Sequence, residues 1–135
     1  MKVIQALNGA LNDLMQSDPK VVLIGEDITD PYGGAFKVTQ GLSTKYPERV
    51  LASPISEAGM VGMATGMSLK GYKPIVEVMF GDFLLLAADQ ILNHAAKFGS
   101  ISLGRTSCNI LIRTPMGGYR GYGATHSQSL EKFII

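Results

Sequence analysis

The chain has 135 residues, which is enough for one domain with a core of its own. Hydrophobic residues make up 46% of it and charged residues 17%, and the net charge of +1 with no basic stripe argues against nucleic-acid binding. The longest unbroken apolar run, 83–88, is too short to cross a membrane, and the first residues lack the pattern of a signal or transit peptide, so we expect a soluble, cytoplasmic protein.

Helical and strand patterns alternate through the first part of the chain. The opening segment carries apolar residues at helical spacing, namely Val3, Leu7, Leu11 and Leu14. The sequence Ser-Asp-Pro at 17–19 should end this helix, and the continuous apolar run 20–25 predicts a strand buried on both faces. A loop at 26–36, a short helix at 38–46 and a short strand at 50–52 are expected to follow.

One carboxylate then stands at a strand-to-helix turn. Pro54 stops the strand, and Ser56 can cap a helix that begins at Glu57 and runs to residue 69, with Gly71 beyond its end. Glycines inside this helix cost roughly 1 kcal/mol each against alanine, which indicates that another backbone or a flat ligand comes close: Gly59, Gly62 and Gly66. Alternatively, Glu57 only complements the helix dipole.

The second half continues the alternation. The pattern predicts a strand at 75–80, a helix at 82–97 that Gly99 closes, and a strand at 109–113. Strands of this kind joined by crossover helices predict an α/β fold, a parallel sheet flanked by helices on both faces. The only cysteine, Cys108, excludes an internal disulfide and is expected to be a buried, inert thiol at the edge of a strand.

A glycine-rich loop at 114–125 follows the last strand, and Ser127 can start a final helix. Segment 117–123 has four glycines in seven residues, which packing explains poorly and which suits a loop that contacts a ligand. His126 comes directly after this loop and is a candidate functional residue, whereas His94 lies mid-helix and is expected at the surface or in packing.

Parallel sheets bind ligands at the carboxyl ends of their strands. The predicted order brings Glu26, Glu57 and His126 to that edge, together with aromatic residues: Tyr32, Phe80, Phe83, Tyr119 and Tyr122. Acids, aromatic rings and a histidine suit a flat ring that contains nitrogen. No cluster of ligands has metal-binding spacing, and no phosphate-cradle motif occurs, so a pyrophosphate would have to be held elsewhere.

With these residues in place, the chain resembles the pyrimidine-binding domain of the beta subunit of thiamine-diphosphate-dependent 2-oxo acid dehydrogenases, in the transketolase-like superfamily. The stretches that carry the resemblance run in family order: IGEDI (24–28), YGGAFKVTQGL (32–42), SPISEAGMVGMATGMSLKGYKPIVEVMF (53–80), DFLLLAADQILNHAAK (82–97) and IRTPMGGYRGYGATHSQSLE (112–131). Transketolase-type enzymes share the fold and the glutamate, but the FKVT, DQ and HSQSLE stretches are similar to the beta-subunit branch.

The resemblance implies roles for individual residues. Glu57 would bond N1′ of the cofactor's aminopyrimidine, and Phe83 would pack against that ring. Glu26 and Tyr32 would line the pocket. His126 would face the reacting carbon and the incoming lipoyl arm.

The resemblance also implies partners. Thiamine diphosphate would be shared with an alpha-type subunit that holds the diphosphate and Mg²⁺, and a lipoyl domain of an acyltransferase would receive the acyl group. Residues 1–135 would form a single pyrimidine-binding domain of an oligomer, without the C-terminal domain of the family.

Other readings remain open at this point. The chain could be a catalytically incomplete interaction module of the same fold, although Glu57 is present, or a subunit of a transketolase-type enzyme. A flavodoxin-like nucleotide-binding domain is a further alternative, against which the missing phosphate loop counts.

Overall fold

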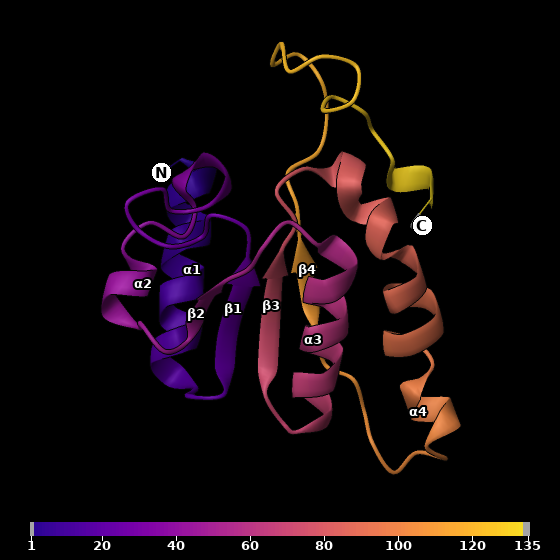
Figure 1. Ribbon diagram of the computed structural model, residues 1–135. Helices are drawn as coiled ribbons and strands as arrows, with labels where there is room; N and C mark the ends of the chain where they lie inside the picture. Colours follow the sequence, from indigo (N-terminus) through magenta and orange to yellow (C-terminus); the bar gives the residue numbers. More distant parts are fainter. Residues whose placement is uncertain (1, 134–135) are drawn as a thin grey trace.

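The centre of the fold is a parallel sheet. In the computed structural model, which describes residues 2–133, four strands lie in the order β2-β1-β3-β4 (Figure 1). Their bounds are Val21–Gly25 for β1, Val50–Ala52 for β2, Lys73–Glu77 for β3 and Leu111–Arg113 for β4. In register, Gly25 lies opposite both Ala52 and Glu77, and Glu77 lies opposite Arg113. All carboxyl ends therefore meet at one edge.

Helices cover both faces of this sheet. Helix α1 (Val3–Ser17) packs on one face and helix α3 (Glu57–Leu69) on the other (Figure 1). Side chains of β1 alternate between the two cores: Val21 and Leu23 face α1, whereas Val22 and Ile24 face α3. The predicted fold, a parallel α/β sheet with helices on both faces, is confirmed.

Local signals define α3 well. The Ser56 hydroxyl accepts a hydrogen bond from the Gly59 N–H at 3.2 Å, so the predicted cap is present. Gly71 follows the helix with a φ of +85°, a conformation that glycine adopts without strain. A Cβ on Gly62 would lie 3.0 Å from Oε1 of Gln90, which explains one helix glycine by close approach, whereas Gly66 has open space around it.

The predicted continuous helix at 82–97 is wrong. The segment is divided into a 3₁₀ helix η2 (Gly81–Ala87), a π-helix η3 (Gln90–Ala95) and a short α4 (Phe98–Ile101), which contains Gly99. Leu84 and Ala87 are both buried against α3, and a 3₁₀ helix places residues three apart on one side. The chain is therefore helical from 81 to 95, but its hydrogen-bond pattern changes along the segment.

The predicted helix at 38–46 is shorter in the structure. A 3₁₀ turn η1 (Ala35–Lys37) precedes α2 (Leu42–Lys45), because Gly41 has a φ of +83° and interrupts the winding. The last helical segment is η4 (Glu131–Phe133), so the helix expected from Ser127 begins later, as a short 3₁₀ turn.

Strand lengths follow pairing rather than hydrophobicity. Strand β3 starts at Lys73 opposite Val21 and ends at Glu77 opposite Gly25, so the apolar residues 78–80 lie beyond the paired strand residues.

Cys108 is half-buried rather than buried, because it precedes β4 and lies outside the core. His94 is on the surface, as expected, with Nδ1 3.5 Å from Oδ2 of Asp89.

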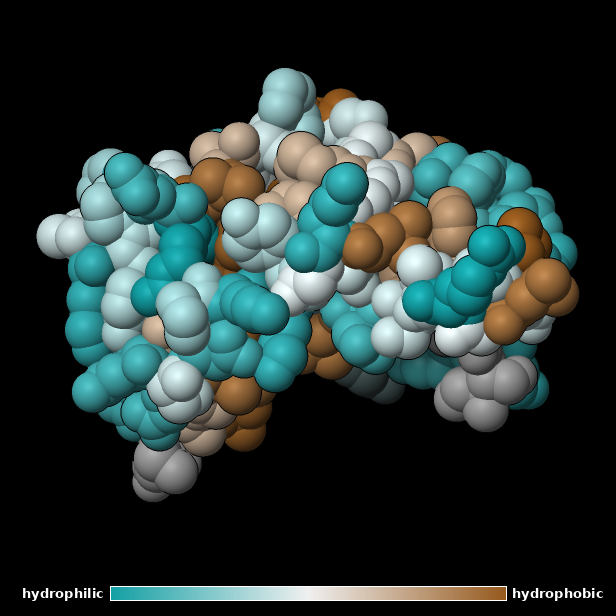
Figure 2. Space-filling model, turned by 90° about the horizontal axis from the view of Figure 1, so that it is seen from below, coloured by the Kyte–Doolittle hydropathy of each residue, from teal (hydrophilic) through white to brown (hydrophobic). Residues whose placement is uncertain are grey.

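The outer surface keeps apolar regions. Seen from below, brown apolar residues come to the surface in the recess between the two sides of the molecule (Figure 2). A hollow between α1 and the edge strand β4 is lined by Leu14, Ile75 and Leu111, and Leu111 is 53% exposed. None of the helices described for residues 2–133 has the length and apolar character needed to span a membrane.

Candidate ring-binding site at the carboxyl edge of the sheet

Glu57 is the first residue of α3, yet it is only 5% exposed. The chain leaves β2 at Ala52 and turns through Pro54 and Ser56, which places the start of α3 at the carboxyl edge of the sheet. A carboxylate that merely complements a helix dipole is normally in contact with water. The burial of Glu57 is therefore unlike that of an acid whose only role is to complement a helix dipole.

Glu26 lies close to Glu57. It follows β1 directly, is buried, and its Oε1 atom has no hydrogen-bond partner within residues 2–133. Burial raises the pKa of Glu26 above its ordinary value, and the negative charges of Glu57 and Asp27 raise it further. The edge of the sheet thus holds two buried acids, one of which has an unpaired oxygen.

The raised pKa makes a prediction for stability. A group whose pKa is raised by folding stabilises the folded state below its unfolded value, here 4.5, and this contribution is lost as the pH rises through the folded value. Because glutamine is neutral throughout, Glu26→Gln should raise the unfolding temperature at about pH 8, and the gain should shrink towards about pH 4. Circular dichroism melts across this range measure it, with the exposed Glu48→Gln as control. A variant that melts below the wild type at the higher pH would contradict the prediction.

Aromatic rings gather in the segments that follow β3 and β4 at this edge of the sheet. The ring of Phe80 lies edge-on to those of Phe83, Tyr122 and His126, at centroid distances of 5.9, 5.7 and 4.9 Å, and the Phe83 and His126 rings are 5.0 Å apart. Phe83 also packs against the core beneath α3. Such edge-to-face contacts hold rings in defined orientations.

The start of η2 positions the loop that carries His126. The Gly81 N–H donates to the Pro115 carbonyl at 2.8 Å, and the Gln128 N–H donates to Oδ1 of Asp82 at 3.0 Å. The Gly117 N–H also donates to the Gln128 carbonyl at 3.2 Å, which closes the base of the loop. The loop itself stands above the carboxyl edge of the sheet (Figure 1).

The remaining predicted residues lie apart from this cluster. Tyr32 is 54% exposed, and its ring centroid is 6.0 Å from Nζ of Lys37. Tyr119 is fully exposed at the tip of the glycine-rich loop. The structure therefore brings together Phe80, Phe83, Tyr122 and His126, but neither Tyr32 nor Tyr119.

Phe36 is a residue that sequence reasoning missed. It lines a small cavity with Phe80, Arg120 and His126, and the Arg120 guanidinium carbon lies 4.1 Å above its ring. The φ of Phe36 is +57°, a conformation uncommon outside glycine. The preceding pair Gly33-Gly34 indicated an irregular loop but not which side chain it would turn inward.

Comparison with known proteins identifies the family of this chain. Residues 1–134 match the family described as "Transketolase, pyrimidine binding domain". The chain belongs to this family. As a pyrimidine-binding domain it has a parallel α/β sheet, and this membership removes the flavodoxin-like alternative.

Relatives of this pyrimidine-binding domain are beta subunits. It is 47% identical to the pyruvate dehydrogenase E1 component subunit beta-2, mitochondrial, of Oryza sativa subsp. japonica, over 95% of the chain and 34% of the relative. Identity is 41% to the 2-oxoisovalerate dehydrogenase subunit beta of Pseudomonas aeruginosa, over 97% and 37%. It is 38% to the pyruvate dehydrogenase E1 component subunit beta of Leifsonia xyli subsp. xyli, over 99% and 40%. The chain thus spans well under half the length of these relatives.

Proposed function

We propose that this domain belongs to a beta-type subunit of a thiamine-diphosphate-dependent 2-oxo acid dehydrogenase and binds the aminopyrimidine of the cofactor. The observation that carries the proposal is the pair of buried acids, Glu26 and Glu57, at the same carboxyl edge of the sheet to which strands β3 and β4 lead the aromatic cluster. The names of the relatives, beta subunits of pyruvate and 2-oxoisovalerate dehydrogenases, support the same assignment.

The residues present fit an aminopyrimidine. Such a ring offers nitrogen acceptors on its edge and an amino group that donates hydrogen bonds. The unpaired Oε1 of Glu26 can accept a hydrogen bond, and a protonated Glu57 can donate one to a ring nitrogen. Phe80 and Phe83 supply apolar surface for the flat ring.

Thiamine diphosphate, when bound, supplies the electron sink for decarboxylation of a 2-oxo acid. The carboxyl group of Glu57 would share a proton with the ring nitrogen, at a position that burial shields from water. Burial, and then the negative charge of Glu57, raise the pKa of Glu26, so Glu26 also holds a proton more firmly than a free glutamate does. His126, with its ring set between Phe80 and Phe83, is placed to move a proton during acyl transfer.

The proposal includes two partners. An alpha-type subunit would hold the diphosphate and Mg²⁺, because this chain has no phosphate-cradle motif and, within residues 2–133, no group of three or more potential metal ligands. A lipoyl domain of an acyltransferase would approach from the side of the glycine-rich loop, where His126 is half exposed. Oxidative decarboxylation with transfer of the acyl group to lipoamide is the resulting activity.

Substitution of Phe83 and His126 tests this function by separating binding from chemistry. Phe83→Ala removes ring packing worth on the order of 1 kcal/mol beyond its buried area, so it should chiefly weaken cofactor affinity in the assembled enzyme. His126→Ala should leave that affinity unchanged and slow acyl transfer to a lipoyl acceptor by roughly 10²-fold. Calorimetry and single-turnover kinetics measure the two effects.

Matched controls exist on the same chain. Tyr46→Ala removes a partly buried ring that packs on the opposite core, and His94→Ala removes the exposed histidine. Both controls should keep cofactor affinity and acyl transfer. Equal loss of cofactor binding in Phe83→Ala and His126→Ala would contradict the proposed division of roles.

A further inference from the structure

A buried ion pair lies at the carboxyl edge of the sheet, outside the group of residues described so far. Glu77, the last residue of β3, is 3% exposed and forms an ion pair with Arg113, the last residue of β4. Its Oε1 atom accepts a hydrogen bond from the Ala35 N–H at 2.5 Å. One carboxylate thus joins two strand ends to the loop at 33–40.

Stability alone explains this pair poorly. Removing two charges from water is costly, and apolar replacement of a buried pair is often neutral or stabilising. Burial indeed lowers the pKa of the Arg113 guanidinium below its ordinary value, which shows the unfavourable desolvation of that charge. Ile75, two residues before Glu77 and therefore on the same face of β3, belongs to an apolar core.

The loop is shaped around the carboxylate. A Cβ on Gly34 would lie 2.7 Å from Oε1 of Glu77 and 2.6 Å from Oγ1 of Thr39, and its φ is +72°, so only glycine fits there. Thr39 is itself tied down, because its hydroxyl donates to the Ile28 carbonyl at 2.8 Å. The position of the Ala35 N–H is therefore determined by contacts on both sides.

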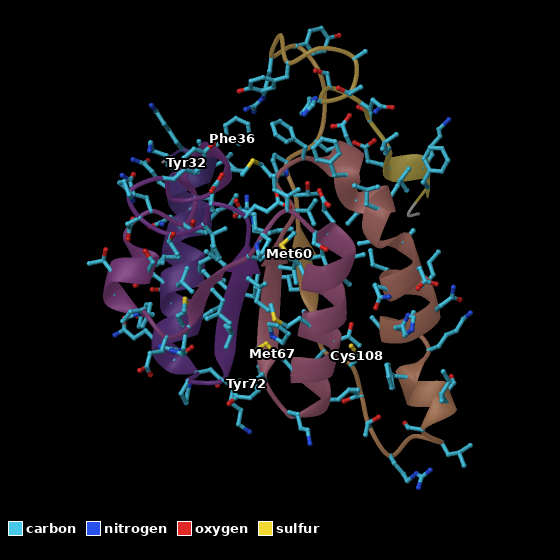
Figure 3. The ribbon with its side chains drawn as sticks, viewed as in Figure 1. Tyr32, Phe36, Met60, Met67, Tyr72 and Cys108 are labelled. Carbon is cyan, nitrogen blue, oxygen red and sulfur yellow. The ribbon has the colours of Figure 1, made fainter. Side chains whose placement is uncertain are left out.

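The next residue, Phe36, carries this arrangement to the ring-binding site. Its ring lies under the Arg120 guanidinium and lines the same cavity as Phe80 and His126. In Figure 3, Phe36 lies on the side of its loop that faces the centre of the molecule. A shift of Ala35 would move Phe36, and with it the partner of Arg120 in the loop that carries His126.

We propose that Glu77 is a positioning residue: it anchors the loop at Ala35 so that Phe36 forms one wall of the site and supports the loop of Arg120 and His126. Arg113 keeps the Glu77 carboxylate in this orientation. Glu77 itself contacts no ligand. The inference rests on the proposed function for its kinetic consequence, but the anchoring can be measured without it.

The decisive variant removes both charges together. Glu77→Met/Arg113→Met leaves no uncompensated charge, so the unfolding temperature should stay within about 5 °C of the wild type. The Ala35 amide loses its acceptor, and its hydrogen-exchange protection should fall by at least about 10-fold. Glu77→Asp keeps the charge beside Arg113 but shortens the side chain, so it should also expose the Ala35 amide.

Two controls separate anchoring from general damage. Arg113→Lys keeps a cation next to Glu77 and should retain protection of Ala35. Ser68→Ala removes a different buried acceptor: the Ser68 hydroxyl accepts a hydrogen bond from the Asn109 N–H at 2.6 Å, before the amino end of β4. This variant should lower stability without changing hydrogen exchange at the Ala35 amide.

The kinetic measurements use the chain assembled with an alpha-type subunit. Both loop-releasing variants should lower kcat/KM for the 2-oxo acid by roughly 10- to 100-fold, because a small displacement of site walls is costly to catalysis. Cofactor affinity should change less than about 3-fold, since Glu57 and Phe83 stand on other elements.

Each outcome bears on the proposal. Unchanged exchange at Ala35 in the double variant overturns the anchor, and if that variant fails to fold, Glu77→Asp decides the same question. Lost protection with unchanged kcat/KM overturns the positioning role. An assembly in which the wild type shows no cofactor-dependent turnover would count against the proposed function, while the exchange data would still decide the anchor.

Discussion

Glu57→Gln is expected to lower turnover of the assembled enzyme by roughly 10²–10⁴-fold, the range for a positioned acid–base group. Glutamine preserves the shape of the side chain but carries no exchangeable carboxyl proton, so the ring nitrogen of the cofactor loses its acid partner. Because the change is isosteric, the fold should remain intact. Turnover with a 2-oxo acid and deuterium exchange at C2 of the bound cofactor measure the effect, and both should slow in parallel.

The neighbouring acid provides a comparison. Glu26→Gln leaves Glu57 in place and should slow C2 exchange less than Glu57→Gln does. Glu48→Gln, an exposed substitution, should leave both rates unchanged. Near-normal C2 exchange in Glu57→Gln would remove Glu57 from the mechanism.

The chain without a partner is expected to bind thiamine diphosphate more weakly than about 1 mM, and addition of a matching alpha-type subunit should bring the Kd to the micromolar range. The pyrimidine end of the cofactor finds Glu57 and Phe83 here. The diphosphate end carries most of the charge, and the described residues 2–133 offer neither a phosphate cradle nor a cluster of metal ligands.

The surface of the chain agrees with this dependence on a partner. Leu85, Leu86 and Leu92 are 41%, 63% and 60% exposed on the outer side of η2 and η3. Leu84, between them and the start of η2, is buried at 8%, because it packs towards α3. Exposed apolar side chains of this density are typical of a surface that another subunit covers.

Calorimetry with thiamine diphosphate and Mg²⁺ tests this second expectation, with light scattering of the same samples to establish the oligomeric state. Titration of the alpha-type subunit without this chain is the control. Tight binding by a monomeric 135-residue chain would exclude a shared site.

The two acids of the site could be located from the sequence, because local patterns mark the ends of the helix and of the strand on which they depend. Ser56 and Gly71 mark the ends of α3, and the apolar run 20–25 marks β1, so Glu57 and Glu26 follow from local patterns. The rule that parallel strands point their carboxyl ends to one edge then places the two acids together. The same rule assigns His126 to this edge of the sheet, because it follows the loop after β4.

By itself, the amino-acid sequence determined the order of helices and strands, the parallel sheet and the edge at which the acids meet, because capping, apolar runs and crossover rules act over short distances. Only the tertiary structure decided that η2 is a 3₁₀ helix packed against α3, and that Phe36 turns towards the cavity lined by Phe80 and His126. It also decided the anchor of that turn, since Glu77 reaches Ala35 across 42 residues and Arg113 across 36. Such contacts leave no periodic pattern in the chain, because they form only where strand ends and loops are brought together by the folded sheet.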